Sequence, residues 1–133
     1  MKVSYTILQS DTFLGKSFIT KLPLLKLEFS KLYYMCLIDT GADISLMNGD
    51  LGKEIGLVIE KGEPFPVKGI DGVIIPSYIH KIEFYIDKYF CKIDAAFSER
   101  FNFPFGLIGR KDFFDLFRIC FNQKENFFEI VPY

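Results

Sequence analysis

Residues 37–43 read Leu-Ile-Asp-Thr-Gly-Ala-Asp, and they continue an apolar run that begins at Tyr33. An apolar run of this length predicts a buried strand, and the polar, glycine-containing residues after it predict a turn. Asp39 therefore stands at the exit of a strand, where its carboxylate is partly desolvated. Thr40 and Gly41 add a hydroxyl group and closely spaced backbone N–H donors that can fix the orientation of that carboxylate.

Asp39 can act as an acid or a base only under certain conditions. A lone aspartate with an ordinary pKa is ionised at neutral pH and cannot also donate a proton. A second carboxylate at about 3 Å changes this, because two like charges that close share one proton, so that one group serves as base and the other as acid. A bare Asp-Thr-Gly is also compatible with an Asx turn that closes a strand. The motif alone leaves both interpretations open.

Most of the remaining chain has the patterns of β-strands. Alternating apolar residues over 25–29 and 80–86 predict half-buried strands, and the second is expected to pair with a strand over 89–97. Residues 63–76 place two β-capable runs around a glycine-bearing tip, which favours a protruding hairpin. An apolar strand closed by glycine is expected over 105–109. The sequence therefore predicts a mainly β fold.

One or two short helices complete this prediction. Residues 48–56 have a capping Asn at one end and a Gly at the other, which is typical of a helix of about two turns. Over 110–117, the spacing of Phe113, Phe114 and Phe117 predicts one buried helical face.

The two ends of the chain are expected to add further strands. Residues 4–8 have a β-branched character, and 118–121 and 127–131 are separated by a polar turn, which favours a hairpin. A chain of 133 residues has the size of one domain. We expect a single domain over the whole chain, with residues 1–21 as an N-terminal extension and 118–133 as a C-terminal hairpin.

Composition limits the partners and the compartment. The 16 Lys and Arg residues nearly balance the 17 Asp and Glu residues, so no strong field would attract nucleic acid. No stretch approaches the roughly 18 apolar residues of a membrane span, and no apolar signal segment follows the N-terminus. We expect a soluble cytoplasmic protein with neither a nucleic-acid nor a membrane partner. The odd number of cysteines argues against a disulfide framework, and we expect reduced, buried thiols at Cys36, Cys91 and Cys120.

Several classes of catalytic site are poorly supported by the residues. His80 is the only histidine, and it lies in phase with Ile82 and Phe84 on a predicted strand, which favours a structural role over a Ser-His-Asp or Cys-His site. Histidines, cysteines and carboxylates do not occur at the spacing of metal ligands, and residues 69–72 lack the pattern of a phosphate-binding loop. We therefore expect neither a metal nor a cofactor.

Three segments together carry a resemblance to a known family. Residues 37–43, Gly69-Ile70-Asp71-Gly72 and Leu107-Ile108-Gly109-Arg110 resemble, in order and approximate separation, the motifs of the retropepsins. These are the dimeric aspartic proteases of retroviruses and their cellular and bacterial relatives. The resemblance covers roughly residues 22–122. It implies a closed, barrel-like β fold with a flap hairpin, and a homodimeric aspartic endopeptidase that hydrolyses an extended peptide or protein substrate without a cofactor.

The resemblance also implies a role for each matched residue. Asp39 matches the catalytic aspartate, and Thr40 matches the hydroxyl residue that braces the two active-site loops across the dimer axis. The other matches are expected to bind substrate (Gly41, Ala42, Asp43, Gly69 and Ile70), to support the active-site loop (Gly41, Leu107, Ile108 and Gly109) or to form an ion pair (Asp43 with Arg110).

Two features depart from the viral enzymes. Asp71 stands where retroviral flaps usually carry glycine, and the chain continues after the helix through a hairpin to Tyr133. That tail is more similar to the DNA-damage-inducible and bacterial retropepsin-like domains. Two alternatives stay open: a non-proteolytic peptide-binding or regulatory module with the same fold, and an unrelated β-barrel in which Asp-Thr-Gly is only a turn.

Overall fold

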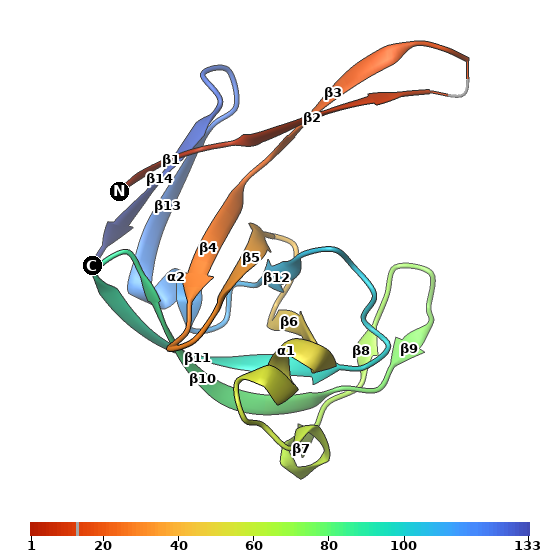
Figure 1. Ribbon diagram of the computed structural model, residues 1–133, viewed down its shortest axis with the longest axis vertical. Helices are drawn as coiled ribbons and strands as arrows, with labels where there is room; N and C mark the ends of the chain where they lie inside the picture. Colours follow the sequence, from red (N-terminus) through yellow and green to blue (C-terminus); the bar gives the residue numbers. More distant parts are fainter. Residues whose placement is uncertain (13) are drawn as a thin grey trace.

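The structure is a computed structural model, which describes residues 1–12 and 14–133. It is built mainly of β-strands, with three short helical segments (Figure 1). The strands are β1 (Lys2–Ser4), β2 (Thr6–Asp11), β3 (Ser17–Leu22), β4 (Leu24–Glu28), β5 (Tyr33–Ile38), β6 (Ser45–Asn48), β7 (Glu63–Pro64), β8 (Val67–Lys68), β9 (Ile74–Ile75), β10 (Tyr78–Ile86), β11 (Tyr89–Ser98), β12 (Gly106–Ile108), β13 (Phe117–Asn122) and β14 (Phe127–Pro132), and the helices are α1 (Gly49–Glu54), the 3-10 helix η1 (Ile59–Lys61) and α2 (Phe113–Leu116).

Six strands close into a barrel. They hydrogen-bond in the order β11-β6-β12-β5-β4-β10, and β10 pairs with β11 to complete the ring, while β7 attaches to β10. Closure removes the exposed edges that an open sheet would present. The prediction of a mainly β, closed and barrel-like fold is confirmed, as are the strands at 80–86 and 89–97 and their pairing.

The barrel core follows from the alternation along β10. Ile82, Phe84 and Ile86 are 3%, 1% and 1% exposed, whereas the residues between them face solvent. In the antiparallel register, Phe84 lies opposite Cys91 and Ile82 opposite Ile93, so that both strands place their apolar side chains on the same inner face. Burial of each Ile or Phe side chain contributes roughly 1.5–3 kcal/mol. This core holds the ends of the strands, and the loops after them, in fixed positions.

The chain ends form two further sheets outside the barrel. Strands β1, β14 and β13 make a three-stranded sheet, in which Phe128 and Ile130 of β14 are fully buried. The expected C-terminal hairpin is therefore present, and it pairs with the N-terminal strand. Strands β2 and β3 form a separate two-stranded hairpin that reaches away from the barrel (Figure 1). The expected extension over residues 1–21 includes residue 13, which lies outside the described residues.

The helix expected over 110–117 is wrong in length. Asp112 has a left-handed backbone with φ of 66°, so α2 begins only at Phe113 and ends after four residues. Phe117 is extended with φ of −139° and starts β13. Phe113 and Phe117 are nevertheless buried, at 0% and 3% exposure, because the chain turns from helix to strand against the core. None of the helices in the described part of the chain is long and apolar enough to cross a membrane.

Other local expectations need correction. The strand expected over 4–8 is divided at Tyr5 into β1 and β2, and the sequence patterns missed β3 and β6. Cys36 and Cys91 are buried free thiols, as expected, but Cys120 is exposed because it points outward from the edge strand β13. Burial raises the pKa of the Cys91 thiol to about 11, so this group stays protonated and unreactive at neutral pH.

Candidate active site

Asp39 follows the last residue of β5. Its backbone N–H donates to the carbonyl oxygen of Ile108 at 2.9 Å, which ties it to the neighbouring parallel strand β12. Its carboxylate Oδ1 accepts the N–H of Gly41 at 2.9 Å, so the turn holds the orientation of the side chain. Among the described residues, no hydrogen bond to its Oδ2 is found. The side chain is half-buried, with one oxygen fixed and one free to meet another group.

A second loop crosses the Asp39 loop and holds it in place. The N–H groups of Arg110 and Lys111 donate to the carbonyl oxygens of Ala42 at 2.9 Å and Asp43 at 2.8 Å. Gly109 lies so close to this loop that a Cβ atom there would meet the backbone carbon of Ile44 at 2.5 Å. Only glycine fits this approach of two backbones. Leu107 and Ile108 of β12 pair with β5 just before the crossing.

Arg110 links both ends of the Asp39 loop. Its Nη1 donates to the carbonyl oxygen of Thr40 at 3.3 Å, and its Nη2 pairs with Oδ1 of Asp43. The side chains of Arg110 and Asp43 are 51% and 87% exposed, so solvent screens this pair and its contribution to stability is small. The contacts instead restrict the conformation of the loop. Thr40 is exposed beside Asp39, and Ala42 is half-buried.

The expected hairpin with the glycine-bearing tip is present. Strands β8 and β9 pair with each other, and the N–H of Gly69 donates to the carbonyl oxygen of Val73 at 2.9 Å. The carboxylate of Asp71 accepts the N–H of Val73 at 3.0 Å and so closes the tip locally. Ile70 at the tip is fully exposed, and Gly72 has a φ of 82°. Asp71 thus has a structural role in a turn that leaves Ile70 free.

Asp94 of β11 anchors the segment after Arg110 to the barrel. Its carboxylate accepts hydrogen bonds from Lys111 Nζ at 2.8 Å and from Lys81 Nζ at 2.9 Å, and its N–H donates to the carboxylate of Asp112 at 2.7 Å. The hydrogen bonds from Lys111 and then from Lys81 lower the pKa of the Asp94 carboxyl from its usual value of 3.8. This network ties the segment that follows the crossing loop to β11.

The lowered pKa makes the contribution of Asp94 depend on pH. Because the folded pKa lies below the unfolded one, the stabilisation is fully present above about pH 4 and is lost as the pH falls through the folded pKa. Asp94→Asn should lower the free energy of unfolding by about 1 kcal/mol at neutral pH, since the lysine partners are exposed. Urea unfolding at neutral pH and below about pH 3 measures this, and the difference from wild type should shrink at the lower pH.

Glu83→Gln is the matched control for this experiment. Glu83 meets Lys92 at 3.7 Å, with both side chains more than half exposed, so its loss should leave the unfolding curve unchanged. A difference between Asp94→Asn and wild type that stays constant over the pH range would contradict the assignment.

His80 lies away from Asp39 in a structural setting. Its Nε2 is 2.9 Å from the carbonyl oxygen of Ile59, and its ring packs edge-on against Phe97 with centroids 5.9 Å apart. In residues 1–12 and 14–133, no group of three His, Cys, Asp or Glu side chains lies close enough together to hold a metal ion. The structural role favoured for His80 agrees with these contacts.

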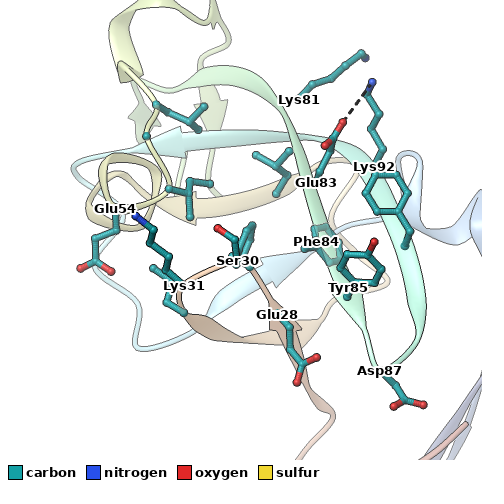
Figure 2. Close-up of a pocket in the computed structure, with 17 residues that line it drawn as sticks. Glu28, Ser30, Lys31, Glu54, Lys81, Glu83, Phe84, Tyr85, Asp87 and Lys92 are labelled. Atoms are coloured by element: carbon teal, nitrogen blue, oxygen red, sulfur yellow. Dashed lines mark ion pairs between the residues drawn. The ribbon is translucent and has the colours of Figure 1, made fainter.

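A hollow of about 1080 Å³ is lined by residues of β10 and β11, of the β4–β5 turn and of the segment at the end of α1, and Asp39 does not line it (Figure 2). Its wall carries alternating charges, including Glu83 paired with Lys92, and the exposed rings of Tyr85 and Phe90, whose centroids are 5.5 Å apart. Two of its carboxylates, Glu28 and Glu83, are already paired with Lys26 at 2.8 Å and with Lys92 at 3.7 Å. We therefore place the candidate chemistry at Asp39, which a single copy of the chain leaves open to its surroundings.

Comparison with known proteins supports this arrangement at the level of the fold. No family model and no curated protein sequence matches the chain. A solved structure of a retropepsin-like aspartic protease from Rickettsia conorii matches with a TM-score of 0.66 and 13% identity, over 98% of this chain and 97% of that one. The chain has the retropepsin fold. The EIAV protease, solved with an inhibitor, matches with a TM-score of 0.55 and 17% identity, over 76% of this chain and 88% of that one.

Sequence patterns did not identify two residues that support the retropepsin fold around Asp39. Ser45 is fully buried, and its Oγ accepts the N–H of Gly109 at 3.1 Å. Pro23 accepts the N–H of Ile38 through its carbonyl oxygen at 3.1 Å. Neither belongs to a motif. A polar serine directly before an apolar pair was the only sequence signal for Ser45, and it is a weak one.

Proposed function

We propose that the chain is an aspartic endopeptidase that acts as a homodimer, with each copy contributing Asp39. The observation that carries this proposal is the setting of the Asp39 carboxylate. It lies at the end of a buried strand, with one oxygen fixed by Gly41 and the other without a partner in the described chain. The retropepsin fold of the Rickettsia conorii protease supports the same assignment.

In the proposed dimer, the two Asp39 carboxylates lie at about 3 Å and share one proton, because two like charges this close cannot both ionise. The ionised carboxylate takes a proton from a water molecule while that water attacks the carbonyl carbon of the peptide. The protonated carboxylate donates to the carbonyl oxygen. The carboxylate that took the proton from water then gives it to the nitrogen, the C–N bond breaks and the amine leaves, while one hydroxyl group of the tetrahedral carbon returns a proton to the other carboxylate.

The surrounding residues have binding roles in this proposal. Thr40 braces the two Asp39 loops across the dimer axis, and Gly41 offers its carbonyl oxygen to the substrate backbone. Ala42 and Asp43 line the cleft. The exposed flap tip, Gly69 and Ile70, covers a peptide held in extended form. We also propose that residues 1–133 form one cytoplasmic domain.

The test is whether cleavage depends on protein concentration. If the site needs two copies, the rate of peptide cleavage per mole of chain should fall on dilution through the dimer dissociation constant. The assay uses an unfolded protein as substrate, with sedimentation of the same samples to measure mass. A strictly monomeric protein that cleaves at a constant rate per mole would overturn the proposal.

A non-proteolytic binding module is the second candidate. The hydrogen bond from Gly41 to Asp39 is also what a purely structural Asx turn would contain. This candidate predicts that the protein binds extended peptides and leaves them intact. Mass spectrometry of a bound peptide after long incubation separates the two candidates.

A further inference from the structure

Strands β2 and β3 form an arm whose outer part lacks a packing partner within the described chain. Their backbones hydrogen-bond only to each other, and the hairpin reaches away from the barrel (Figure 1). Ile7, Leu8, Phe18 and Ile19 are all between 46% and 61% exposed. A two-stranded hairpin alone is only marginally stable in water. The arm therefore needs a second surface to cover it.

The register divides the arm into two different faces. Leu8 pairs with Thr20 and Ser10 pairs with Phe18, so these residues share one face, whereas Asp11 and Lys21 belong to the other. The uncharged face consists of Thr6, Leu8, Ser10, Phe18, Thr20 and Leu22. The charged face consists of Ile7, Gln9, Asp11, Ser17, Ile19 and Lys21. The uncharged face can be buried without leaving a charge unpaired.

The base of the arm is tied directly to the candidate active site. Pro23 follows β3, and its carbonyl oxygen accepts the N–H of Ile38, the residue before Asp39, at 3.1 Å. On the other side, Lys21 Nζ donates to the carbonyl oxygen of Gln123 at 3.2 Å and braces the base against the β13–β14 turn. The arm starts beside the end of β5 (Figure 1). It thus leaves the barrel next to the strand end that carries Asp39.

The chain ends contribute to the same argument. Strand β1 pairs with β14 over Lys2–Glu129 to Ser4–Phe127 within one copy, and β14 is held on its other edge by β13. Strand β14 is therefore covered on both edges, and the free edges of this sheet belong to β1 and β13. The arm, whose base is hydrogen-bonded to the end of β5, carries four large apolar side chains that are about half exposed.

We propose that the uncharged face of the arm packs against a second copy of this chain, so that each protomer clasps the other. This inference rests on the proposed homodimer. Through the hydrogen bond between Pro23 and Ile38, the seated arm also holds the end of β5 and thereby positions Asp39. The partner copy would stabilise both the arm and the site it completes.

Hydrogen exchange of the wild-type protein provides the first test. The backbone amides of β2 and β3 should exchange rapidly at low protein concentration and become protected as the dimer forms, in parallel with the mass measured by sedimentation. Protection that appears only when a substrate peptide or another protein is added would overturn the inference. A dimer whose arm amides stay unprotected would overturn it as well.

Paired substitutions on the two faces provide the second test. Leu8→Ser with Phe18→Ser should raise the dimer dissociation constant roughly tenfold or more, because large apolar side chains dominate interface energies. Ile7→Ser with Ile19→Ser is the matched control, since these side chains are at least as exposed and lie on the charged face, and it should leave the constant unchanged. Thermal unfolding of each variant, measured at a concentration where wild type is monomeric, checks that the barrel is intact.

The outcomes separate this inference from the proposed function. If the dimer cleaves peptides and the uncharged-face variant does not weaken it, the proposed packing of the arm against a second copy is overturned. The protease assignment then still stands. If the variant weakens the dimer but the protein never cleaves peptides, the packing of the arm against a second copy is supported and the protease assignment is overturned. Equal weakening by both pairs overturns the assignment of the interface to the uncharged face. A monomer at every concentration overturns both proposals.

Discussion

Asp39→Asn should lower kcat for peptide cleavage by at least about 10³-fold, because an amide can neither share a proton with a second carboxylate nor accept one from water. The fold should not change, since the amide oxygen of Asn can still accept the N–H of Gly41. The measurement is cleavage of an unfolded protein by wild type and variant at equal dimer concentration. Turnover by the variant equal to wild type would reject Asp39 as the catalytic group.

Two controls make this result specific. Asp50→Asn removes a carboxylate from the exposed start of α1 and should leave kcat unchanged. Mixing wild type with an excess of the Asp39→Asn variant should remove nearly all activity, because most wild-type chains then lie in dimers that have one aspartate. At a fixed amount of wild type, adding an equal amount of the variant should leave roughly half the activity of wild type alone, because half of its chains then pair with each other. Additive activity in the mixtures would show that each chain works alone.

Several strands of the barrel were predictable from sequence because they have a clear periodicity, whereas the closed barrel was expected from the resemblance to the retropepsins. Along β10, buried and exposed residues alternate without interruption from Lys81 to Ile86, and β5 is a continuous apolar run. These patterns arise from burial of one or both faces. β3 could not be found in this way because both of its faces are largely exposed, so no core imposes a period on it. β6 was missed because Ser45 is buried by a hydrogen bond to another loop.

The helix at 110–117 shows a second limit of local patterns. The apolar spacing of Phe113, Phe114 and Phe117 is a valid helical signal, but one residue with a left-handed backbone delays the start of the helix. Asp112 adopts this conformation while its carboxylate accepts the N–H of Asp94 on β11. A contact with a strand eighteen residues away is invisible to local propensity. The tertiary contact therefore decides where the helix begins.

In the candidate site, too, some residues could be found from local sequence and others act only through contacts with distant parts of the chain. Asp39, Gly41 and Gly109 were named because they match the motifs of the retropepsins, in which turns and close backbone approaches demand particular residue types. Pro23 and Asp94 act through a carbonyl oxygen and through lysine partners, which leave no recognisable pattern in the chain. The residues that match a motif could therefore be named from the sequence, and the residues that hold them in place could not.

Gly109→Ala should both destabilise the protein and impair catalysis. The added methyl group would lie 2.5 Å from the carbon and 2.6 Å from the oxygen of the Ile44 carbonyl, and both are backbone atoms that cannot rotate away. Separating the two loops would stretch the hydrogen bonds from Gly109 to Ser45 and from Arg110 to Ala42. Overpacking of this kind costs about 2–3 kcal/mol of folding free energy.

The catalytic loss should exceed what the loss of folded protein explains. The same crossing loops hold Asp39, and a displacement of about 1 Å at a reacting group can cost roughly 10²-fold in rate. Urea unfolding gives the stability change, and kcat is then measured at a temperature where the variant is fully folded. Gly56→Ala is the matched control: its φ of 94° imposes strain of about 1 kcal/mol, but nothing lies within 4 Å of the new methyl group, so kcat should not change. A folded Gly109→Ala protein with wild-type kcat would mean that the loops can separate without moving Asp39, and that the crossing serves stability alone.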